Sequence, residues 1–257
     1  MPKPQGSFVW YELMTSDAKA GEAFYRDVVG WGAQGAGMPG VDYTLMTVGS
    51  MPVAGMMTMP AEACSAGAKP GWIGYVGTDD VDASVAKVSK LGGKVHKGPA
   101  DIPGVGRFAV VADPDGAVFA LFKWQPPQDG ERPAPDAPGT TAWRELYTGD
   151  LQGVFDFYAQ LFGWSKADAF DMGPMGTYQL FAHDGETIGG MMTKPAQAPR
   201  PCWNYYFNVD AMGAAVERVK RDGGQVLTGP MQVPGGSWII QGLDPQNAAF
   251  ALLSRNA

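Results

Sequence analysis

The hydrophobic and polar positions of residues 8–58 predict a strand, a helix and then a pair of strands. Residues 8–15, FVWYELMT, are rich in aromatic and β-compatible side chains, which is typical of a strand. Helix signals follow in residues 18–29, where apolar side chains recur every fourth position between two capping residues: Ala20, Phe24 and Val28, with Asp17 before them and Gly30 after them. Residues 43–49 and 52–58 are expected to be strands joined by a tight turn. A short strand near Trp31 would complete a βαβββ unit.

The same order of patterns recurs in residues 72–124. Residues 72–77 predict a strand, and Asp80 or Asp82 is expected to cap a helix. One stripe of this helix is apolar and ends at a glycine pair: Val81, Val85, Val88 and Leu91, then Gly92 and Gly93. Three more strands are expected at residues 94–97, 107–112 and 117–124, and the sequence ADPDG between the last two is typical of a hairpin turn rather than a calcium-binding loop.

Nearly the whole pattern occurs twice. WYELMTSDAKAGEAFYRDVVGW, which begins at Trp10, returns as WRELYTGDLQGVFDFYAQLFGW from Trp143, and VAGMMTMP returns as IGGMMTKP. The segments that begin at Trp72 and Trp203 also match. We therefore predict a first module at residues 1–125, a Pro-rich linker at 126–141 and a second module at 142–257, each built of two βαβββ units. The fold class is α+β, with helices on one face of each curved mixed sheet and the other face free to form a cup.

Composition narrows the class of protein. Hydrophobic residues make up 45% of the 257 residues, no apolar run is long enough to span a membrane, and the N-terminus lacks the layout of a signal peptide. A net charge of −7 without a basic cluster argues against nucleic acid or a membrane as a partner. We expect a cytoplasmic protein. Its two cysteines, Cys64 and Cys202, are expected to be reduced, although the sequence leaves a disulfide open.

The repeated motifs resemble those of the vicinal oxygen chelate superfamily, which includes glyoxalases, bleomycin resistance proteins and extradiol dioxygenases. The resemblance rests on WYELxxxD…AFY…GW, a strand followed by a DVDA-type helix start, the GG and GP loops, and DPDGAVFALF. It covers about the whole chain and is strongest to tandem-module members, the CFP-30B type among them. It implies two modules of the glyoxalase type. Because single-module relatives pair as dimers, it also implies a monomer with an internal pseudo-dimer or a weak homodimer.

The resemblance also implies where a divalent metal would be held: by His, Gln or Glu on the first, fourth, fifth and eighth strands of a module. The first-strand position falls on Trp10 and Trp143, and the eighth-strand position falls on Ala120 and Ala251. The fifth-strand position falls on Ile73 and Asn204, or on Trp72 and Trp203 if the strand is shifted by one residue. The fourth strands offer no carboxylate or imidazole. The only two histidines of the sequence, His96 and His183, are at non-equivalent positions of the two modules, and we expect both to be solvent-exposed loop residues. We therefore expect no metal and no cofactor.

A repeated Trp/Glu pair is the first candidate for chemistry. Glu12 and Glu145 each follow a tryptophan by two residues, so each pair shares one face of its strand. Inside an aromatic cup, desolvation would raise the pKa of such a carboxyl group and suit it to proton transfer, which makes these two residues the candidate catalytic groups. The alternative is a structural carboxylate that is hydrogen-bonded to a neighbouring strand or to the other module.

Further residues are assigned to ligand binding from alternation along the strands. These candidates are Trp10, Trp143, Tyr75, Tyr206, Asn204, Arg107 and Trp238. The planar guanidinium group of Arg107 suits an anionic group, although pairing with an acidic neighbour at the surface is the more common role. The methionines of the MMTM and MMT segments fit either an apolar wall of the site or simple core packing.

Three classes of function remain open. The first is metal-free binding of a small organic molecule in an aromatic cup, as the resemblance to resistance proteins implies. The second is a glyoxalase-like lyase, a dioxygenase-like enzyme or a metal-independent acid/base enzyme that acts on a small aldehyde or an aromatic compound. The third is protein interaction by a chain whose cups are vestigial. Missing metal ligands favour the first class, and the repeated glutamates keep an acid/base enzyme in consideration.

Overall fold

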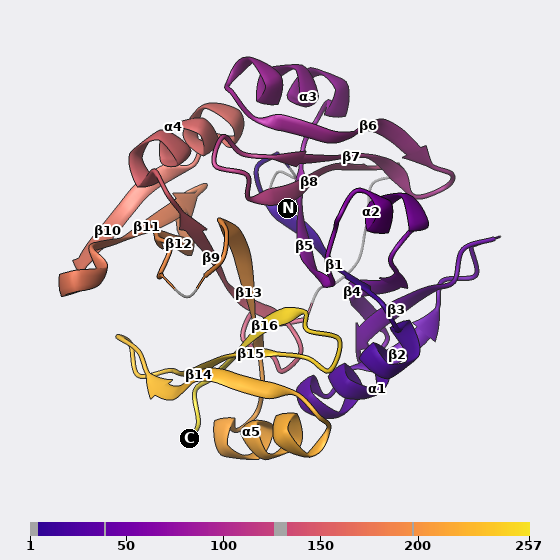
Figure 1. Ribbon diagram of the computed structural model, residues 1–257, viewed down its shortest axis with the longest axis vertical. Coiled ribbons are helices and arrows are strands. Elements are labelled where there is room, and N and C mark those ends of the chain that lie inside the picture. Colours follow the sequence, from indigo (N-terminus) through magenta and orange to yellow (C-terminus); the bar gives the residue numbers. More distant parts are fainter. Residues whose placement is uncertain (1–4, 39, 126–132, 197) are drawn as a thin grey trace. The chain divides into compact units, whose positions relative to one another are not determined.

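The computed structural model describes residues 5–38, 40–125, 133–196 and 198–257. Its elements follow the repeated pattern in order (Figure 1). The first half contains β1 (Phe8–Thr15), α1 (Ala18–Val29), β2 (Gly32–Gly35), β3 (Tyr43–Val48), β4 (Met51–Thr58), α2 (Ala61–Ser65), β5 (Gly71–Gly77), α3 (Val81–Lys90), β6 (Lys94–Ile102), β7 (Gly106–Ala112) and β8 (Val118–Trp124).

The second half repeats this order without a counterpart of α2. It contains β9 (Thr141–Thr148), α4 (Leu151–Phe162), β10 (Ser165–Asp171), the 3₁₀ turn η1 (Gly173–Met175), β11 (Thr177–His183), β12 (Glu186–Thr193), β13 (Cys202–Asn208), α5 (Met212–Arg221), β14 (Gln225–Gln232), β15 (Trp238–Leu243) and β16 (Ala249–Ser254).

Most of the predicted elements and their ends are confirmed. Asp17 accepts a hydrogen bond from the amide of Ala20 at the start of α1, and Gly30 ends this helix with a φ of 85°. Asp80, rather than Asp82, caps α3. Two features differ from the prediction. The short helix α2 has no apolar periodicity to reveal it. Strand β6 runs beyond residue 97, because its pairing with β7 resumes at Ala100 after a register shift.

The strands form two eight-stranded mixed sheets, which confirms the α+β fold class. Their orders are β2-β3-β4-β1-β5-β8-β7-β6 and β10-β11-β12-β9-β13-β16-β15-β14. In both sheets the first strand of a module pairs in parallel with the fourth, as Glu12 does with Gly55 and Glu145 with Gly190. The two sheets therefore reproduce the sequence repeat strand by strand.

The chain also divides into two compact units, and each unit takes segments from both sequence modules. Unit 1 comprises residues 1–9, 73–130 and 143–204, and unit 2 comprises residues 10–72, 131–142 and 205–257. The predicted module boundaries at 125 and 141 stay predictions, and residues 126–132 of the linker lie outside the described residues.

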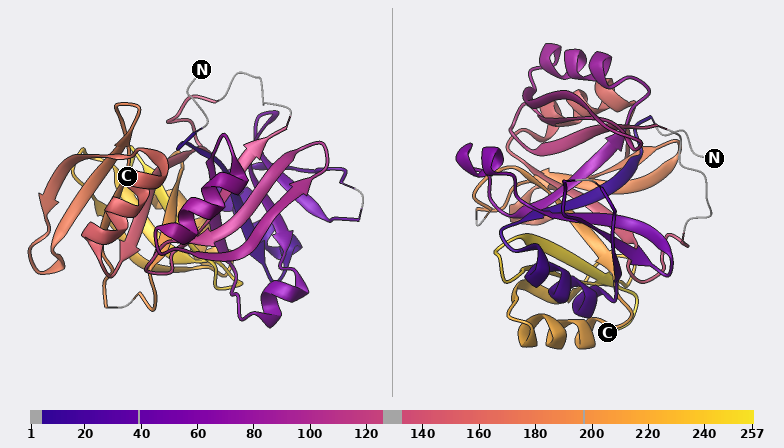
Figure 2. Two further views of the ribbon diagram at one scale, coloured as in Figure 1. Left: turned by 90° about the horizontal axis from the view of Figure 1, so that it is seen from above. Right: turned by 90° about the vertical axis from the view of Figure 1, so that its right-hand side faces the viewer.

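The four longer helices, α1, α3, α4 and α5, each pack on one face of strands in their own unit. Figure 1 shows α3 across β6–β8 and α5 across β14–β16, and the right-hand view of Figure 2 shows both helices from the side. In unit 2, α1 packs on β4 so closely that a Cβ atom on Gly21 would lie 3.2 Å from the sulfur of Met56. These four helices do not cover the opposite face of the strands, which we call the uncovered face. No helix in the described part of the chain is long and apolar enough to cross a membrane.

Candidate functional site

Glu12 lies on the face of its sheet that α1 does not cover. Residues paired in register on neighbouring strands point to the same face, so Glu12 shares a face with Gly55, and Leu13 shares the other with Met56. Met56 contacts α1. Glu12 therefore points away from the helix, as the strand alternation predicts. Glu145 on β9 pairs in the same way with Gly190 on β12, so these two residues also share one face of their sheet.

A hydrogen-bonded triad stands on this uncovered face in unit 2. The indole Nε1 of Trp10 donates to the hydroxyl of Tyr43 at 2.9 Å. The hydroxyl of Tyr43 in turn donates to Oε2 of Glu12 at 2.8 Å. Glu12 is only 7% exposed. The tyrosine thus connects the predicted Trp/Glu pair, and we call this group the first triad.

The equivalent residues of the second module form a second triad in unit 1. Nε1 of Trp143 donates to the hydroxyl of Tyr178 at 2.8 Å, and that hydroxyl donates to Oε1 of Glu145 at 3.0 Å. Glu145 is also 7% exposed. Sequence reasoning missed both tyrosines. The available signal was that Tyr43 and Tyr178 lie within the first two residues of equivalent strands of the repeat, in the sequences YTL and YQL.

A glycine on the strand between tyrosine and glutamate makes each triad possible. Tyr43 is on β3 and Glu12 is on β1, with β4 between them. A Cβ atom on Gly55 of β4 would overlap the hydroxyl and ring of Tyr43. The ring therefore lies over the glycine and reaches across the strand. Gly190 and Tyr178 have the same relation.

The two tyrosines are held in their protonated form. Burial raises the pKa of Tyr43 well above its usual value, and the negative charge of Glu12 raises this pKa further. The pKa of Tyr178 is raised for the same reasons, first by burial and then by Glu145. Each tyrosine is therefore a neutral phenol that donates a hydrogen bond to a carboxylate and accepts one from an indole. The predicted rise in the pKa of the glutamates themselves stays a prediction.

The fifth strand of each module has its tryptophan on the helix side. Nε1 of Trp72 donates to the hydroxyl of Tyr25 on α1, and Nε1 of Trp203 donates to Tyr158 on α4. Successive strand residues alternate in direction, so the neighbours of these tryptophans, Ile73 and Asn204, point to the opposite face. The shifted register, which would place Trp72 and Trp203 at the site, is excluded.

Unit 1 adds two polar side chains from β13 to the uncovered face. Cys202 and Asn204 are two residues apart and therefore point the same way. Burial raises the pKa of the Cys202 thiol to about 11, with Arg200 acting to lower this pKa and the charge of Glu145 acting to raise it. Nδ2 of Asn204 is buried and has no hydrogen-bond partner in the described part of the chain. Cys64 and Cys202 are both free thiols.

Two further predicted residues share the uncovered face. Tyr206 is 2% exposed and accepts a hydrogen bond from Nε2 of Gln241 at 2.7 Å. Tyr75, its counterpart, is 5% exposed and packs its ring against Phe122 at a centroid distance of 5.7 Å. In register, Tyr75 pairs with Ala120 and Tyr206 with Ala251, so the two eighth-strand alanines also point to this face.

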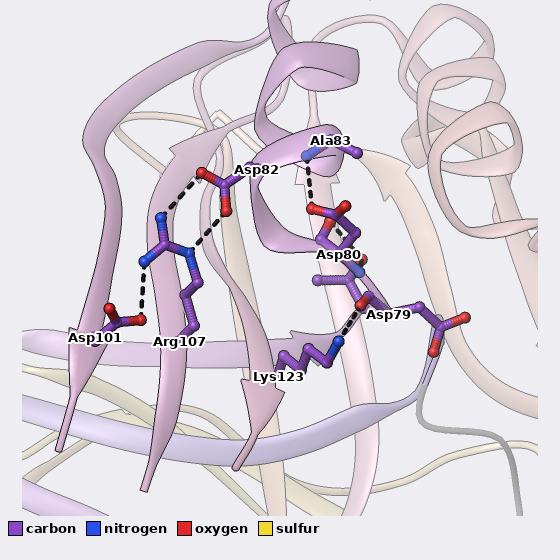
Figure 3. Close-up of polar contacts among 8 residues, drawn as sticks. Asp79, Asp80, Asp82, Ala83, Asp101, Arg107 and Lys123 are labelled. Atoms are coloured by element: carbon purple, nitrogen blue, oxygen red, sulfur yellow. Dashed lines mark hydrogen bonds and ion pairs between the residues drawn. The ribbon is translucent and has the colours of Figure 1, made fainter. Parts of the chain in front are cut away.

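Arg107 and Trp238 lie on the helix-covered face, which corrects the alternation assumed for them. Arg107 pairs with Lys123, whereas Val110 pairs with Ala120, so Arg107 and Ala120 point in opposite directions. The guanidinium group binds Asp82 of α3 at 2.7 and 2.9 Å and Asp101 of β6 at 2.8 Å (Figure 3). Arg107 therefore pairs with acidic neighbours, which the sequence analysis gave as the alternative to binding an anionic ligand.

For Trp238 the reason is the same. It pairs in register with Ser254, whereas Gln241 pairs with Ala251, so Trp238 and Gln241 point to opposite faces of β15. Ser254 donates a hydrogen bond to the carbonyl of Asp210, directly before α5.

Buried carboxyl groups also anchor the helix side of each unit. The hydroxyl of Tyr158 donates to Oδ2 of Asp113 at 3.1 Å, and Tyr25 donates to Asp244 at the same distance. Both aspartates begin hairpin turns, where their other oxygen accepts backbone amides. This confirms the predicted turn at DPDG and shows the same turn at the equivalent sequence DPQN, residues 244–247. Burial raises the pKa of Asp113 to about 6. These groups support the fold rather than the uncovered face.

The residues present do not fit a divalent metal ion at the positions that the fold resemblance implies. An indole N–H is a donor without a lone pair for a metal, and alanine has no donor atom. Among the described residues no three His, Cys, Asp or Glu side chains are clustered in a way that would hold a metal. His96 lies on the edge strand β6, and His183 ends β11 with its Nε2 at 3.7 Å from Asp184.

The comparisons with known proteins agree with this architecture. The sequence model of the Glyoxalase/Bleomycin resistance protein/Dioxygenase superfamily matches residues 7–121 and 140–252. A Mycobacterium tuberculosis protein described as "Putative glyoxylase CFP32" is 32% identical over 251 residues, which cover 97% of this chain and 95% of that protein. The anthracycline biosynthesis protein DnrV of Streptomyces peucetius is 31% identical over 261 residues, covering 96% of this chain and 93% of DnrV.

Solved structures resemble the fold at lower identity. The Mn(II)-bound glyoxalase from Novosphingobium aromaticivorans has a TM-score of 0.64 at 17% identity and covers 99% of this chain and 83% of that chain. The 2,2',3-trihydroxybiphenyl 1,2-dioxygenase from Sphingomonas wittichii has a TM-score of 0.64 at 16% identity, with 97% and 90% covered. The chain therefore belongs to the glyoxalase/bleomycin resistance protein/dioxygenase superfamily.

Proposed function

We propose that this protein binds a small organic molecule on the uncovered face of its sheets, without a metal ion. The observation that carries the proposal is the recurrence of one triad, Trp–Tyr–Glu, at equivalent places in both modules. A triad of this kind is not needed to close a sheet, because the strands already satisfy their backbone groups with one another.

The chemistry of the triads indicates the kind of ligand. A carboxylate has about four acceptor sites, and we infer that Glu12 and Glu145 use one of them to accept from a ligand hydroxyl or N–H group. Tryptophan and tyrosine add apolar ring surface. We infer a ligand with an aromatic or apolar body and at least one hydrogen-bond donor. The relative named for anthracycline biosynthesis supports the choice of aromatic probes.

Titration of tryptophan fluorescence with a panel of hydroxylated aromatic compounds tests the proposal. Glu12→Gln and Glu145→Gln replace a charged acceptor by a neutral amide, so one or both should weaken binding about tenfold, as expected for a hydrogen bond to a charged group. Glu62→Gln and Glu186→Gln change exposed carboxylates in the same two units and should leave affinity unchanged. Equal loss in all four variants, or no binding by any compound, rejects the proposal.

Elemental analysis of the purified protein tests the metal-free part separately. The donor groups at the family's metal positions predict a metal content far below one ion per chain. A stoichiometric divalent metal that survives dialysis would contradict this part. Such a result would not affect the fluorescence titration, because the two measurements are independent.

A second candidate is a metal-independent acid/base enzyme, and the hydrogen bonds from tyrosine that hold each glutamate, at 2.8 and 3.0 Å, favour it. In such an enzyme the glutamate would accept a proton from a small aldehyde or aromatic compound, and tyrosine would hold the carboxylate in place. Turnover of any screened compound that is abolished by Glu12→Gln or Glu145→Gln, with folding retained, would establish this candidate. Unchanged rates in both variants would exclude it.

A further inference from the structure

The uncovered faces of the two modules differ at the start of the fifth strand. The second module carries Cys202 and Asn204 where the first module carries Gly71 and Ile73. Two polar side chains thus stand where the first module has none. The triads themselves are equivalent, so this difference is a candidate for what distinguishes the two faces.

The side-chain amide of Asn204 has a polar atom, Nδ2, for which the described residues supply no hydrogen-bond partner. Its Nδ2 is buried, yet no described residue accepts a hydrogen bond from it. Leaving such a donor unsatisfied costs about 1–3 kcal/mol, and buried side-chain donors in native proteins are usually paired. Isoleucine at the equivalent position of the first module shows that the strand does not require a polar residue there. The amide is therefore suited to a partner from outside the chain.

Asn204 and the second triad belong to one face of unit 1. Strand β13 is the neighbour of β9 in the sheet, and both Asn204 and Glu145 are within unit 1. Trp203 points to α4, so Asn204 and Cys202 point to the other face.

These two groups have complementary hydrogen-bonding roles. The amide Nδ2 of Asn204 donates, and the carboxylate of Glu145 accepts. Trp143 and Tyr178 supply aromatic surface next to Glu145. A ligand that meets both requirements has a carbonyl oxygen and a hydroxyl or N–H group, because Asn204 and Glu145 are on neighbouring strands of one sheet.

We propose that the second module holds the selective ligand site, and that this site takes a carbonyl compound that also carries a hydroxyl or N–H group. Asn204 donates to the carbonyl oxygen, and Glu145 accepts from the hydroxyl or N–H. The first module has isoleucine instead of asparagine and lacks the carbonyl donor at this position. This inference rests on the proposed binding function and identifies the module and the ligand class.

Three matched probes separate the two hydrogen bonds. 2-Hydroxyacetophenone has a phenyl ring, a carbonyl and a hydroxyl; 2-phenylethanol lacks the carbonyl; acetophenone lacks the hydroxyl. The wild-type protein should bind 2-hydroxyacetophenone most tightly by fluorescence titration. Asn204→Leu keeps the side-chain size but cannot donate, so it should weaken 2-hydroxyacetophenone and acetophenone roughly three- to tenfold and leave 2-phenylethanol unchanged.

Matched variants and an independent readout complete the test. Ile73→Leu, at the equivalent place in the first module, should change no affinity, and Glu145→Gln should weaken only the two hydroxyl compounds. Without ligand, Asn204→Leu should raise Tm, because it removes an unpaired buried donor.

The opposite results would overturn the inference. A fall in Tm for Asn204→Leu would show that the amide has a structural role. Wild-type binding of 2-phenylethanol with no preference for 2-hydroxyacetophenone would overturn the inference and leave the proposed function standing. Absence of binding by all three probes and by the aromatic panel would overturn both.

Discussion

The ring of Tyr43 lies directly over Gly55, so that a Cβ atom at position 55 would occupy the place of the tyrosine hydroxyl. The absence of a side chain on β4 lets a residue of β3 reach a carboxylate on β1. Gly190 provides the same space for Tyr178. The glycines of VAGMMTMP and IGGMMTKP are therefore as much a part of the triads as the three side chains.

Alanine at these glycines should break the triads. We expect Gly55→Ala or Gly190→Ala to displace the tyrosine ring and to lower the free energy of unfolding by about 1–3 kcal/mol. Gly35→Ala in unit 2 and Gly98→Ala in unit 1 are matched controls, because a Cβ atom there would meet nothing within 4 Å. Urea denaturation measures the four values.

A double-mutant cycle separates this overlap from other effects of the added methyl group. In a Tyr43→Ala background the ring is gone, so Gly55→Ala should cost much less than it does in the wild-type protein. Equal costs in the two backgrounds would show that the ring and the glycine are not coupled.

The buried carboxyl of Asp113 should make stability depend on pH. Burial raises its pKa from 3.8 to about 6 in the folded protein. The folded state therefore binds a proton more tightly than the unfolded state. The stabilising contribution is complete below about pH 4 and is lost as the pH rises through about 6, with a total near 3 kcal/mol by linkage.

Asp113→Asn removes this titration while keeping one side-chain oxygen for the turn amides. The difference in unfolding free energy between wild type and Asp113→Asn should shift in favour of the variant as the pH rises from 4 to 7. Asp168→Asn, at an exposed position, provides the baseline for removing a charge. A pH-independent difference for Asp113→Asn would contradict the raised pKa.

The two cysteines should differ strongly in reactivity. The thiol of Cys202 has a pKa of about 11, so roughly one molecule in several thousand carries the reactive thiolate at pH 7.5. Cys64 is exposed. Brief treatment with iodoacetamide at this pH, followed by mass spectrometry, should therefore modify Cys64 and leave Cys202 intact. The charge of Glu145 raises the pKa of Cys202, so Glu145→Gln should speed the modification of Cys202. Comparable labelling of both cysteines in the wild-type protein would contradict the raised pKa of Cys202.

The turn of the second module that contains Gln246 offers a position for a stabilising substitution, and the equivalent turn of the first module, which contains Asp115, shows which contacts it lacks. In unit 1, Oδ2 of Asp115 accepts from the hydroxyl of Thr148 and, at 2.7 Å each, from the amides of Gly149 and Asp150. The equivalent residues of unit 2 are Gln246 and Thr15, whose side-chain oxygens are both buried without a partner in the described part of the chain.

Gln246→Asp should restore these contacts in unit 2 and stabilise the protein by about 0.5–2 kcal/mol, the size of a capping interaction. The exchange Asp115→Gln should have the opposite effect in unit 1. Thermal unfolding of both variants checks the pair. A lower Tm for Gln246→Asp would show that the two turns are not interchangeable.

The sequence was sufficient for those features that depend on neighbouring residues. The caps Asp17 and Gly30, the DPDG turn and the repeat of strand and helix patterns each involve positions a few residues apart, where local propensity and periodicity operate. The repeat also located Trp10, Glu12 and their counterparts on one face of their strands. Strand alternation alone was sufficient for that result.

Features that depend on distant pairings were not predictable in this way. The link between Glu12 and Tyr43 spans two strand pairings, and no local pattern specifies those registers. Arg107 was assigned to the wrong face because the pleat of β7 is set by its pairing with β8, and an error of one residue reverses every side chain. Asn204 was placed at the fifth-strand position, but its unpaired amide is apparent only in three dimensions.

The composition of the compact units has a consequence for biosynthesis. Unit 1 is complete once residue 204 has been made, whereas unit 2 joins residues 10–72 to residues 205–257, which are made later. Strands β2, β3 and β4 therefore leave the ribosome before the residues that complete their unit, 205–257, have been made. A nascent chain arrested shortly after residue 204 would contain one unit able to fold and an N-terminal segment still in need of protection from aggregation.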